Sequence, residues 1–97
     1  PVVIDGFIAG AAALIATELS THLASYLIAG HTSVEQGHGH ILKHLDLLPL
    51  LNLELRLGEG TGATLAMSII EGALCTHREM LTFAEAGVSE RTDEQEA

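Results

Sequence analysis

Positive charge is scarce in this sequence. Lys and Arg together number four against thirteen Asp and Glu, which gives a formal net charge of -9 at pH 7. Proteins that bind nucleic acids or anionic membrane surfaces present a surplus of positive charge to them. The composition therefore argues against nucleic acid and membrane surfaces as partners.

Cysteine is nearly absent as well. Cys75 is the single cysteine, so no disulfide can form within the chain. A lone thiol fits a reducing compartment, and no basic segment precedes an apolar stretch in the manner of a signal peptide. We therefore expect a cytoplasmic protein.

No hydrophobic run has the character of a membrane span. The longest, residues 7–30, contains Glu18 and His22 and is rich in small residues. We predict that it belongs to a protein core, because a membrane helix needs a long and nearly uncharged apolar stretch. The 97 residues suffice for one small domain. The chain starts at Pro1 inside an apolar run, as if cut from a longer protein, and residues 89–97 are typical of a frayed, acidic C-terminus.

The hydrophobic pattern predicts alternating strands and helices. Apolar residues follow helical spacing in three segments, and short apolar runs or period-two alternation mark three strands. The predicted strands cover residues 2–4, 26–29 and 51–57, and the predicted helices cover residues 8–23 with a break near Ser20, 38–45, and 65–86 as one helix or two, capped by Gly87. This order predicts an α/β fold of three layers, with a parallel sheet flanked by helices.

Ligands of parallel sheets bind beyond the carboxyl ends of the strands. Three segments of this chain fall there: Asp5-Gly6, residues 30–37 and residues 58–62. The third lies in Arg56–Ala63, which reads RLGEGTGA. It is not a phosphate-binding P-loop, because a P-loop has Lys and then Ser or Thr directly after its last glycine, and here Ala63 and Thr64 follow Gly62.

Glu59 is the one charged side chain among those glycines. The free amides and the dipole at a helix start favour negative charge. Glu59 is therefore either an ionised carboxylate ready to accept a proton, or a first-turn acid that only complements the dipole.

The middle segment is rich in histidine. His31, His38, His40 and His44 lie close to Ser33 and Glu35 in the sequence. His40 and His44 have the four-residue spacing of a metal-binding pair on a helix, but no third ligand suggests itself, and solvated or buried histidines are the simpler interpretation. We predict no metal.

Asp5 and Arg56 each allow two interpretations. Asp5 follows a strand, so it either binds a ribose or a metal or caps a turn and helix, as Asp-Gly commonly does. Arg56 pairs either with Glu54 or with a substrate anion.

Several blocks of the sequence together resemble one enzyme family. These are PVVIDGF followed by AAAL, YLIAGHTSVEQGH, LRLGEGTGA and REMLTFAEAGV, in this order from Pro1 to about Val88. They are similar to the C-terminal part of nicotinate-nucleotide–dimethylbenzimidazole phosphoribosyltransferases. The resemblance implies that residues 1–88 are the C-terminal portion of a catalytic domain of that family and that residues 89–97 form a polar tail.

The resemblance also implies an activity. Such enzymes transfer phosphoribose from nicotinate mononucleotide to 5,6-dimethylbenzimidazole in cobalamin lower-ligand synthesis, as homodimers and without a cofactor. Glu59 would be the general base and Ser33 a contact for the nucleotide phosphate. Gly30, His31, Gly58 and Gly60 complete the expected substrate-binding set.

The sequence departs from the family in two ways. Gln36 replaces the usual proline of an E-P-G-H block, and family members are much longer. We therefore expect the 97-residue chain alone to be inactive. The alternatives are a non-catalytic structural or oligomerisation module of the same fold, and a small metal-binding protein that uses the histidine cluster.

Overall fold

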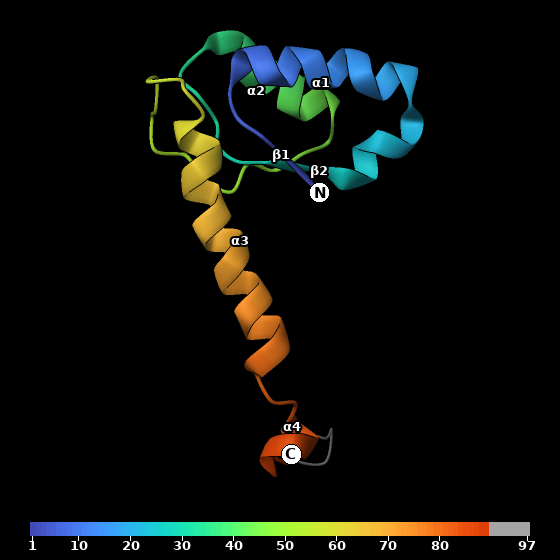
Figure 1. Cartoon of the computed structure of the whole chain (residues 1–97), viewed down its shortest axis with the longest axis vertical. Helices are drawn as coiled ribbons and strands as arrows, with labels where there is room; N and C mark the ends of the chain where they lie inside the picture. The colour runs from blue at the N-terminus through green and yellow to red at the C-terminus, as the bar shows by residue number, and fades with distance from the viewer. Residues whose placement is uncertain (90–97) are drawn as a thin grey trace, which may run out of the picture.

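The computed structural model describes residues 1–89. In chain order its elements are β1 (Val2–Ile4), α1 (Phe7–Leu19), the 3-10 helix η1 (Thr21–Tyr26), β2 (Leu27–Ala29), α2 (Gln36–His44), α3 (Thr61–Glu79) and α4 (Phe83–Ala86) (Figure 1). Of the predicted acidic tail, all but Ser89 lies outside the described residues.

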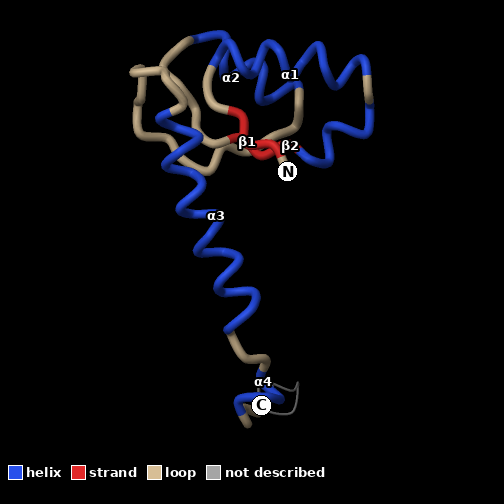
Figure 2. Tube along the Cα trace, viewed as in Figure 1, coloured by secondary structure: helices blue, strands red, loops and turns tan. Residues whose placement is uncertain are grey.

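The two strands form a short parallel sheet. Val3 lies opposite Ile28, and the Gly30 amide continues the ladder by donating to the Ile4 carbonyl. Beyond β2, a parallel bridge joins His31 to Leu51. Figure 2 shows how small this sheet is beside the helices and the long loop before α3. The strands thus deliver two successive loops, after Ile4 and after Ala29, to the same edge.

The core lies between the strands and the first two α-helices. Its buried residues are Ile4, Ala13, Leu27, Ala29 and Leu42. Ala13 belongs to α1 and Leu42 to α2, so both helices cover the same side of the sheet. The small side chains of Ala13 and Ala29 let α1 approach the strands closely.

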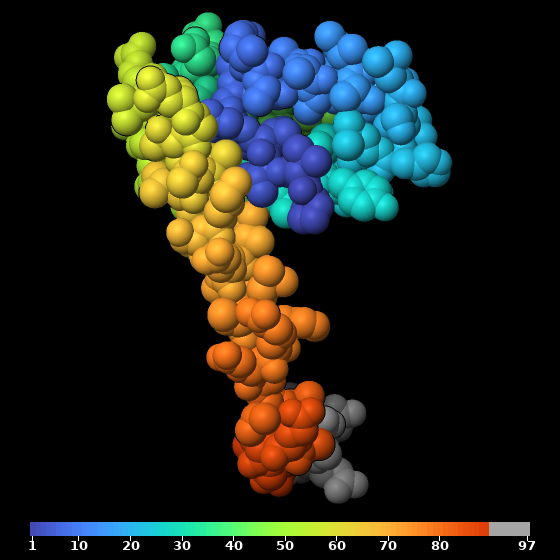
Figure 3. Space-filling model, in the orientation of Figure 1, coloured from blue at the N-terminus to red at the C-terminus, as the bar shows by residue number. Residues whose placement is uncertain are grey.

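Helix α3 leaves this body after its first two turns. Its buried residues, Gly62, Ala63 and Ala66, all lie near its N-terminus. The rest projects outward, as the space-filling view shows (Figure 3), and accounts for the 51 Å long dimension of the molecule. Within residues 1–89, no helix combines the length and apolarity that crossing a membrane demands.

Most of the predicted elements are confirmed. The strands at residues 2–4 and 27–29, the break at Ser20, and a short helix over residues 36–44 all appear. The predicted last helix is a pair, α3 and α4, and Gly87 ends α4 in the left-handed conformation with φ 72°. A parallel sheet with packed helices is thus correct, whereas the three-layer arrangement is not confirmed.

The predicted strand over residues 51–57 is wrong. After the bridge at Leu51 the segment forms no further ladder, and Glu54 takes a left-handed φ of 57°. Leu53 and Leu57 are 56% and 76% exposed. The alternating leucines mimic a half-buried strand, but a left-handed residue turns the chain out of the extended conformation.

Substitutions at two glycines of α3 test how closely its first turn packs against the rest of the protein. A Cβ at Gly62 would collide with the His31 ring, whereas a Cβ at Gly72 meets nothing within 4 Å. We expect Gly62→Ala to lower the free energy of unfolding by about 1–3 kcal/mol through overpacking. Gly72→Ala should raise it by up to about 1 kcal/mol, because alanine favours helix. Urea unfolding of both variants checks this, and equal effects would contradict the close packing at Gly62.

Candidate functional site

The three predicted ligand-binding loops meet at one cleft. It has a volume of about 550 Å³ and contains residues from all three. The lining residues are Asp5, Gly6, Phe7, Ile8 and Ala9 after β1; His31, Ser33 and Glu35 after β2; and Leu55, Arg56, Gly58 and Glu59 before α3. Apolar and charged groups therefore face one another across a space large enough for a small-molecule ligand.

Glu59 lies in an unusual turn. Gly58, Glu59 and Gly60 all have positive φ, of 76°, 56° and 77°. Glycine adopts this conformation freely, but a side chain there costs roughly 1 kcal/mol. Residues held in such conformations concentrate at functional sites. The turn presents the exposed Glu59 side chain at the wall of the cleft.

Glu59 does not belong to the first turn of α3. Gly60 is the N-cap, and the first turn carries no acidic residue. Among the described residues, no hydrogen bond or ion pair engages the Glu59 carboxylate. The simpler interpretation, an acid that only complements the helix dipole from within the first turn, therefore does not describe its position.

The carboxylate that caps the start of α3 is that of Asp5. Its Oδ1 accepts a hydrogen bond of 3.0 Å from the Ala63 amide, the third residue of α3. The same oxygen lies 3.3 Å from Nε2 of His31. Capping was one of the two interpretations of Asp5, but the helix it caps starts 56 residues later in the chain. Sequence patterns around Asp5 point only to its own helix, so this contact could not be found from them.

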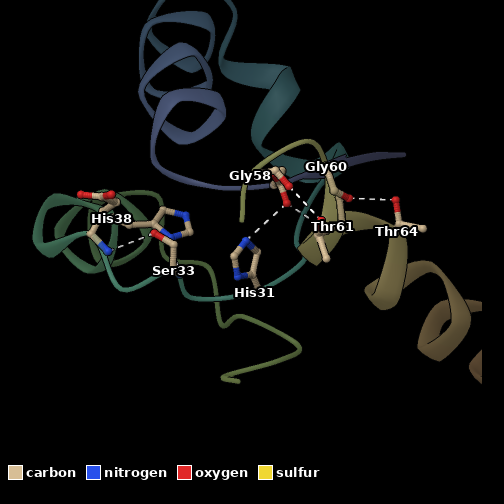
Figure 4. Close-up of polar contacts among 10 residues, drawn as sticks. His31, Ser33, His38, Gly58, Gly60, Thr61 and Thr64 are labelled. Carbon is tan, nitrogen blue, oxygen red and sulfur yellow. Dashed lines mark hydrogen bonds and ion pairs between the residues drawn. The ribbon is translucent and has the colours of Figure 1, made fainter. Parts of the chain in front are cut away.

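His31 is packed beneath the start of α3. It is 4% exposed, and its ring occupies the space that a Gly62 Cβ would need. A Cβ at Gly30 would lie 3.0 Å from the Ala63 Cα. The two glycines thus let the loop after β2 and the first turn of α3 touch through their backbones. Figure 4 shows His31 between Ser33 and His38 on one side and Gly58, Gly60 and Thr61 on the other.

The loop with Ser33 is fixed by a second buried histidine. The Ser33 amide donates to Nδ1 of His38 at 2.9 Å, and Ser33 Oγ accepts from the Glu35 amide at 3.3 Å. Within residues 1–89 no acceptor takes the hydroxyl hydrogen of Ser33, so it can donate to a ligand. His38 is fully buried, and desolvation, followed by the nearby His31, lowers its pKa. A neutral His38 is what the contact requires, because only a deprotonated Nδ1 accepts a hydrogen bond.

The histidines do not gather into a metal centre. His31 and His38 lie inside, with ring centroids 5.9 Å apart, whereas His40 and His44 are exposed. His44 lies 3.9 Å from Glu18. Residues 1–89 contain no group of three or more side chains positioned to hold a metal ion.

Of the other residues considered for substrate binding, some line the cleft and others do not. Gly58 lines the cleft, whereas Gly30 and Gly60 do not. Arg56 lines it too, and in the part of the chain that the structure covers it forms no ion pair with Glu54. Sequence reasoning missed Phe7 and Ile8, which reach the cleft because α1 begins directly after the Asp5-Gly6 turn.

The chain matches a known family over nearly its whole length. A family model described as phosphoribosyltransferase matches residues 1–88. A relative from Chloroflexus aurantiacus, named nicotinate-nucleotide–dimethylbenzimidazole phosphoribosyltransferase, is 66% identical over 91 residues, which are 94% of this chain and 26% of the relative. A relative of the same name from Chloroflexus aggregans is 61% identical over 93 residues, 96% of this chain and 26% of its own.

A solved structure shows the same fold. The crystal structure of nicotinate-nucleotide–dimethylbenzimidazole phosphoribosyltransferase from Thermus thermophilus superimposes with a TM-score of 0.88 at 50% identity. The match covers 94% of this chain and 27% of that one. The chain therefore spans about a quarter of the length of its relatives. That this quarter is their C-terminal part stays a prediction.

Burial of His38 predicts a pH-dependent stability. Its pKa is lowered from 6.5 in the folded protein, so below that pH the unfolded chain binds more protons. The contribution of neutral His38 to the free energy of unfolding is complete above pH 6.5. It declines as the pH falls from there through the lower pKa that His38 has in the folded protein. His38→Asn keeps an acceptor for the Ser33 amide but does not titrate. We expect urea unfolding between pH 7.5 and 5.0 to show a shallower loss of stability for His38→Asn than for the wild type.

The control is His22→Asn, which removes an exposed histidine. It should retain the wild-type slope. A wild-type slope in His38→Asn would contradict the assignment of this pH dependence to His38.

Proposed function

Because the chain belongs to the phosphoribosyltransferase family, we propose that it forms part of an enzyme that transfers phosphoribose from nicotinate mononucleotide to 5,6-dimethylbenzimidazole or a related base. The observation that supports this most directly is the position of Glu59. Its carboxylate stands at the wall of a cleft with no partner among residues 1–89, where a ligand can reach it. Glu54, on the same loop, is also exposed but does not line the cleft, so the place of Glu59 at the cleft wall is what distinguishes it.

The chemistry needs one proton acceptor. A ring nitrogen of the benzimidazole attacks C1′ of the ribose while the bond from C1′ to the nicotinate nitrogen breaks. Nicotinate leaves with the bonding electron pair, which neutralises its positively charged ring, and the benzimidazole proton passes to Glu59. The ribose passes through a state with oxocarbenium character, as in glycoside hydrolysis. A negative carboxylate in the cleft also stabilises that positive charge.

Binding the phosphate of nicotinate mononucleotide requires hydrogen-bond donors and cations, because carboxylates repel it. Ser33 offers a free hydroxyl hydrogen, and Arg56 is the cation of the cleft. We place the phosphate against Ser33 and Arg56, and the benzimidazole against Glu59. The carboxylates of Asp5, Glu35 and Glu59 outnumber that cation. Further phosphate donors must therefore come from outside these residues, so the 97-residue chain alone should be inactive.

Removing the proposed base tests the function. In the protein at its native length, we expect Glu59→Gln to lower kcat by about 10²–10⁴-fold, the usual contribution of a general base. The KM for both substrates should change little, because the amide keeps the shape of the side chain. Release of nicotinate and formation of α-ribazole phosphate measure the rate.

Two further variants complete that test. Glu54→Gln changes an exposed glutamate of the same loop that also has positive φ but does not line the cleft, and it should keep full activity. Ser33→Ala should raise the KM for nicotinate mononucleotide more than it lowers kcat. Full activity of Glu59→Gln would instead favour the alternative of a non-catalytic structural module.

We also propose that the protein is a homodimer, as the family resemblance implies. The projecting part of the chain exposes apolar side chains, including Ile69 at 51%, Leu74 at 53% and Phe83 at 56%. A second copy packing along α3 would remove them from water. Sedimentation velocity should show a dimer for the wild type and for Leu48→Glu, which alters an exposed leucine before Pro49, and a monomer for Leu74→Glu. A monomeric wild type would refute the dimer.

A further inference from the structure

The Asp5 carboxylate links three parts of the chain that are distant in sequence. It follows β1, accepts from the Ala63 amide of α3, and contacts Nε2 of His31 after β2. These contacts join the two strand-end loops to the start of α3. Gly60, the N-cap of α3, supplies no capping side chain, so Asp5 is the capping group for that helix.

His31 restrains the same helix start sterically. Its buried ring lies against Gly62, where no side chain fits. The Ala63 amide is therefore drawn toward Asp5 while the backbone at Gly62 rests on the imidazole. A hydrogen bond at Ala63 and a steric contact at Gly62 therefore both act on the first turn of α3.

The turn that carries Glu59 is bound to this first helical turn. The amide and hydroxyl of Thr61 both donate to the Gly58 carbonyl, at 3.1 and 2.9 Å. The amide and hydroxyl of Thr64 both donate to the Gly60 carbonyl, at 2.9 and 2.8 Å. Four bonds therefore tie the residues on either side of Glu59 to α3. Any displacement of the helix start carries Glu59 with it.

We propose that Asp5 and His31 are positioning residues for Glu59, and that neither acts on the substrate directly. The proposal rests on the proposed role of Glu59 as the base. Both residues line the cleft. The proposal nevertheless revises the expectation that His31 binds substrate, because the residue is 4% exposed and its ring contacts Asp5 and Gly62. A displacement of about 1 Å in a catalytic group can lower a rate by about 100-fold, so the positioning contact matters to catalysis.

The test uses the protein at its native length with Asp5→Ala, Asp5→Asn and the control Asp46→Asn. Asp46 takes part in none of these contacts and does not line the cleft. We expect Asp5→Ala to lower kcat by about 10–100-fold with the KM for both substrates within about threefold. Asp5→Asn retains an acceptor oxygen for the Ala63 amide and should recover most of that loss. Asp46→Asn should match the wild type.

A double variant separates positioning from direct action. If Asp5 acts only through Glu59, Asp5→Ala should cost little more than about threefold in a Glu59→Gln background, because residues that act as a unit are not additive. A full loss in that background, or a large rise in KM, would overturn the proposal in favour of direct substrate contact.

Hydrogen exchange at the Ala63 amide gives a readout independent of activity. Protection should fall in Asp5→Ala and persist in Asp5→Asn. Lost protection with an unchanged kcat would overturn the positioning role, and unchanged protection would overturn the capping contact itself. Should Asp5→Ala fail to fold, His31→Asn carries the same comparison, and unchanged exchange and kcat in that variant would refute the proposal. Failure of the proposed function appears separately, as full activity of Glu59→Gln.

Discussion

The hydrogen bond from the Ala63 amide to the Asp5 carboxylate is the contact on which the rest of the site depends. It spans 58 residues of sequence and fastens a long, largely unsupported helix to the small sheet. Without it, α3 would be held near its start mainly by Gly62, Ala63 and Ala66. The burial of those small residues provides little apolar area, so a directional polar contact has to set the position of the helix.

The cleft follows from this attachment. β1 and β2 run parallel, so their following loops emerge at the same edge, and the capped start of α3 brings the third loop to meet them. The two buried histidines each support one part of the site. His31 lies beneath the α3 turn, and His38 holds the amide of Ser33. Glu59 and Ser33, two of the residues with proposed chemical roles, are thereby carried on loops whose backbones are fixed from within the protein.

The sequence predicted the features that local physics determines. Short apolar runs identified both strands, helical spacing identified the helices, and the order of elements placed Asp5, Ser33 and Glu59 at one edge. The alternating leucines of residues 51–57 led to a wrong prediction of a strand, because alternation does not reveal whether a neighbouring strand exists to pair with. The sequence could not reveal that Asp5 caps α3, or which of the clustered histidines are buried, since both depend on contacts between distant segments. The family resemblance, by contrast, singled out Glu59 through several blocks of sequence in order.

The central claim is that Glu59, held at the start of α3, faces the nitrogen that loses its proton in the cleft. The most direct measurement is a crystal structure of the protein at its native length with bound α-ribazole phosphate. The account predicts a benzimidazole nitrogen within about 3 Å of the Glu59 carboxylate, hydrogen-bonding distance, with the phosphate toward Ser33. A base nitrogen facing a different acidic residue, or a ligand bound outside this cleft, would contradict it.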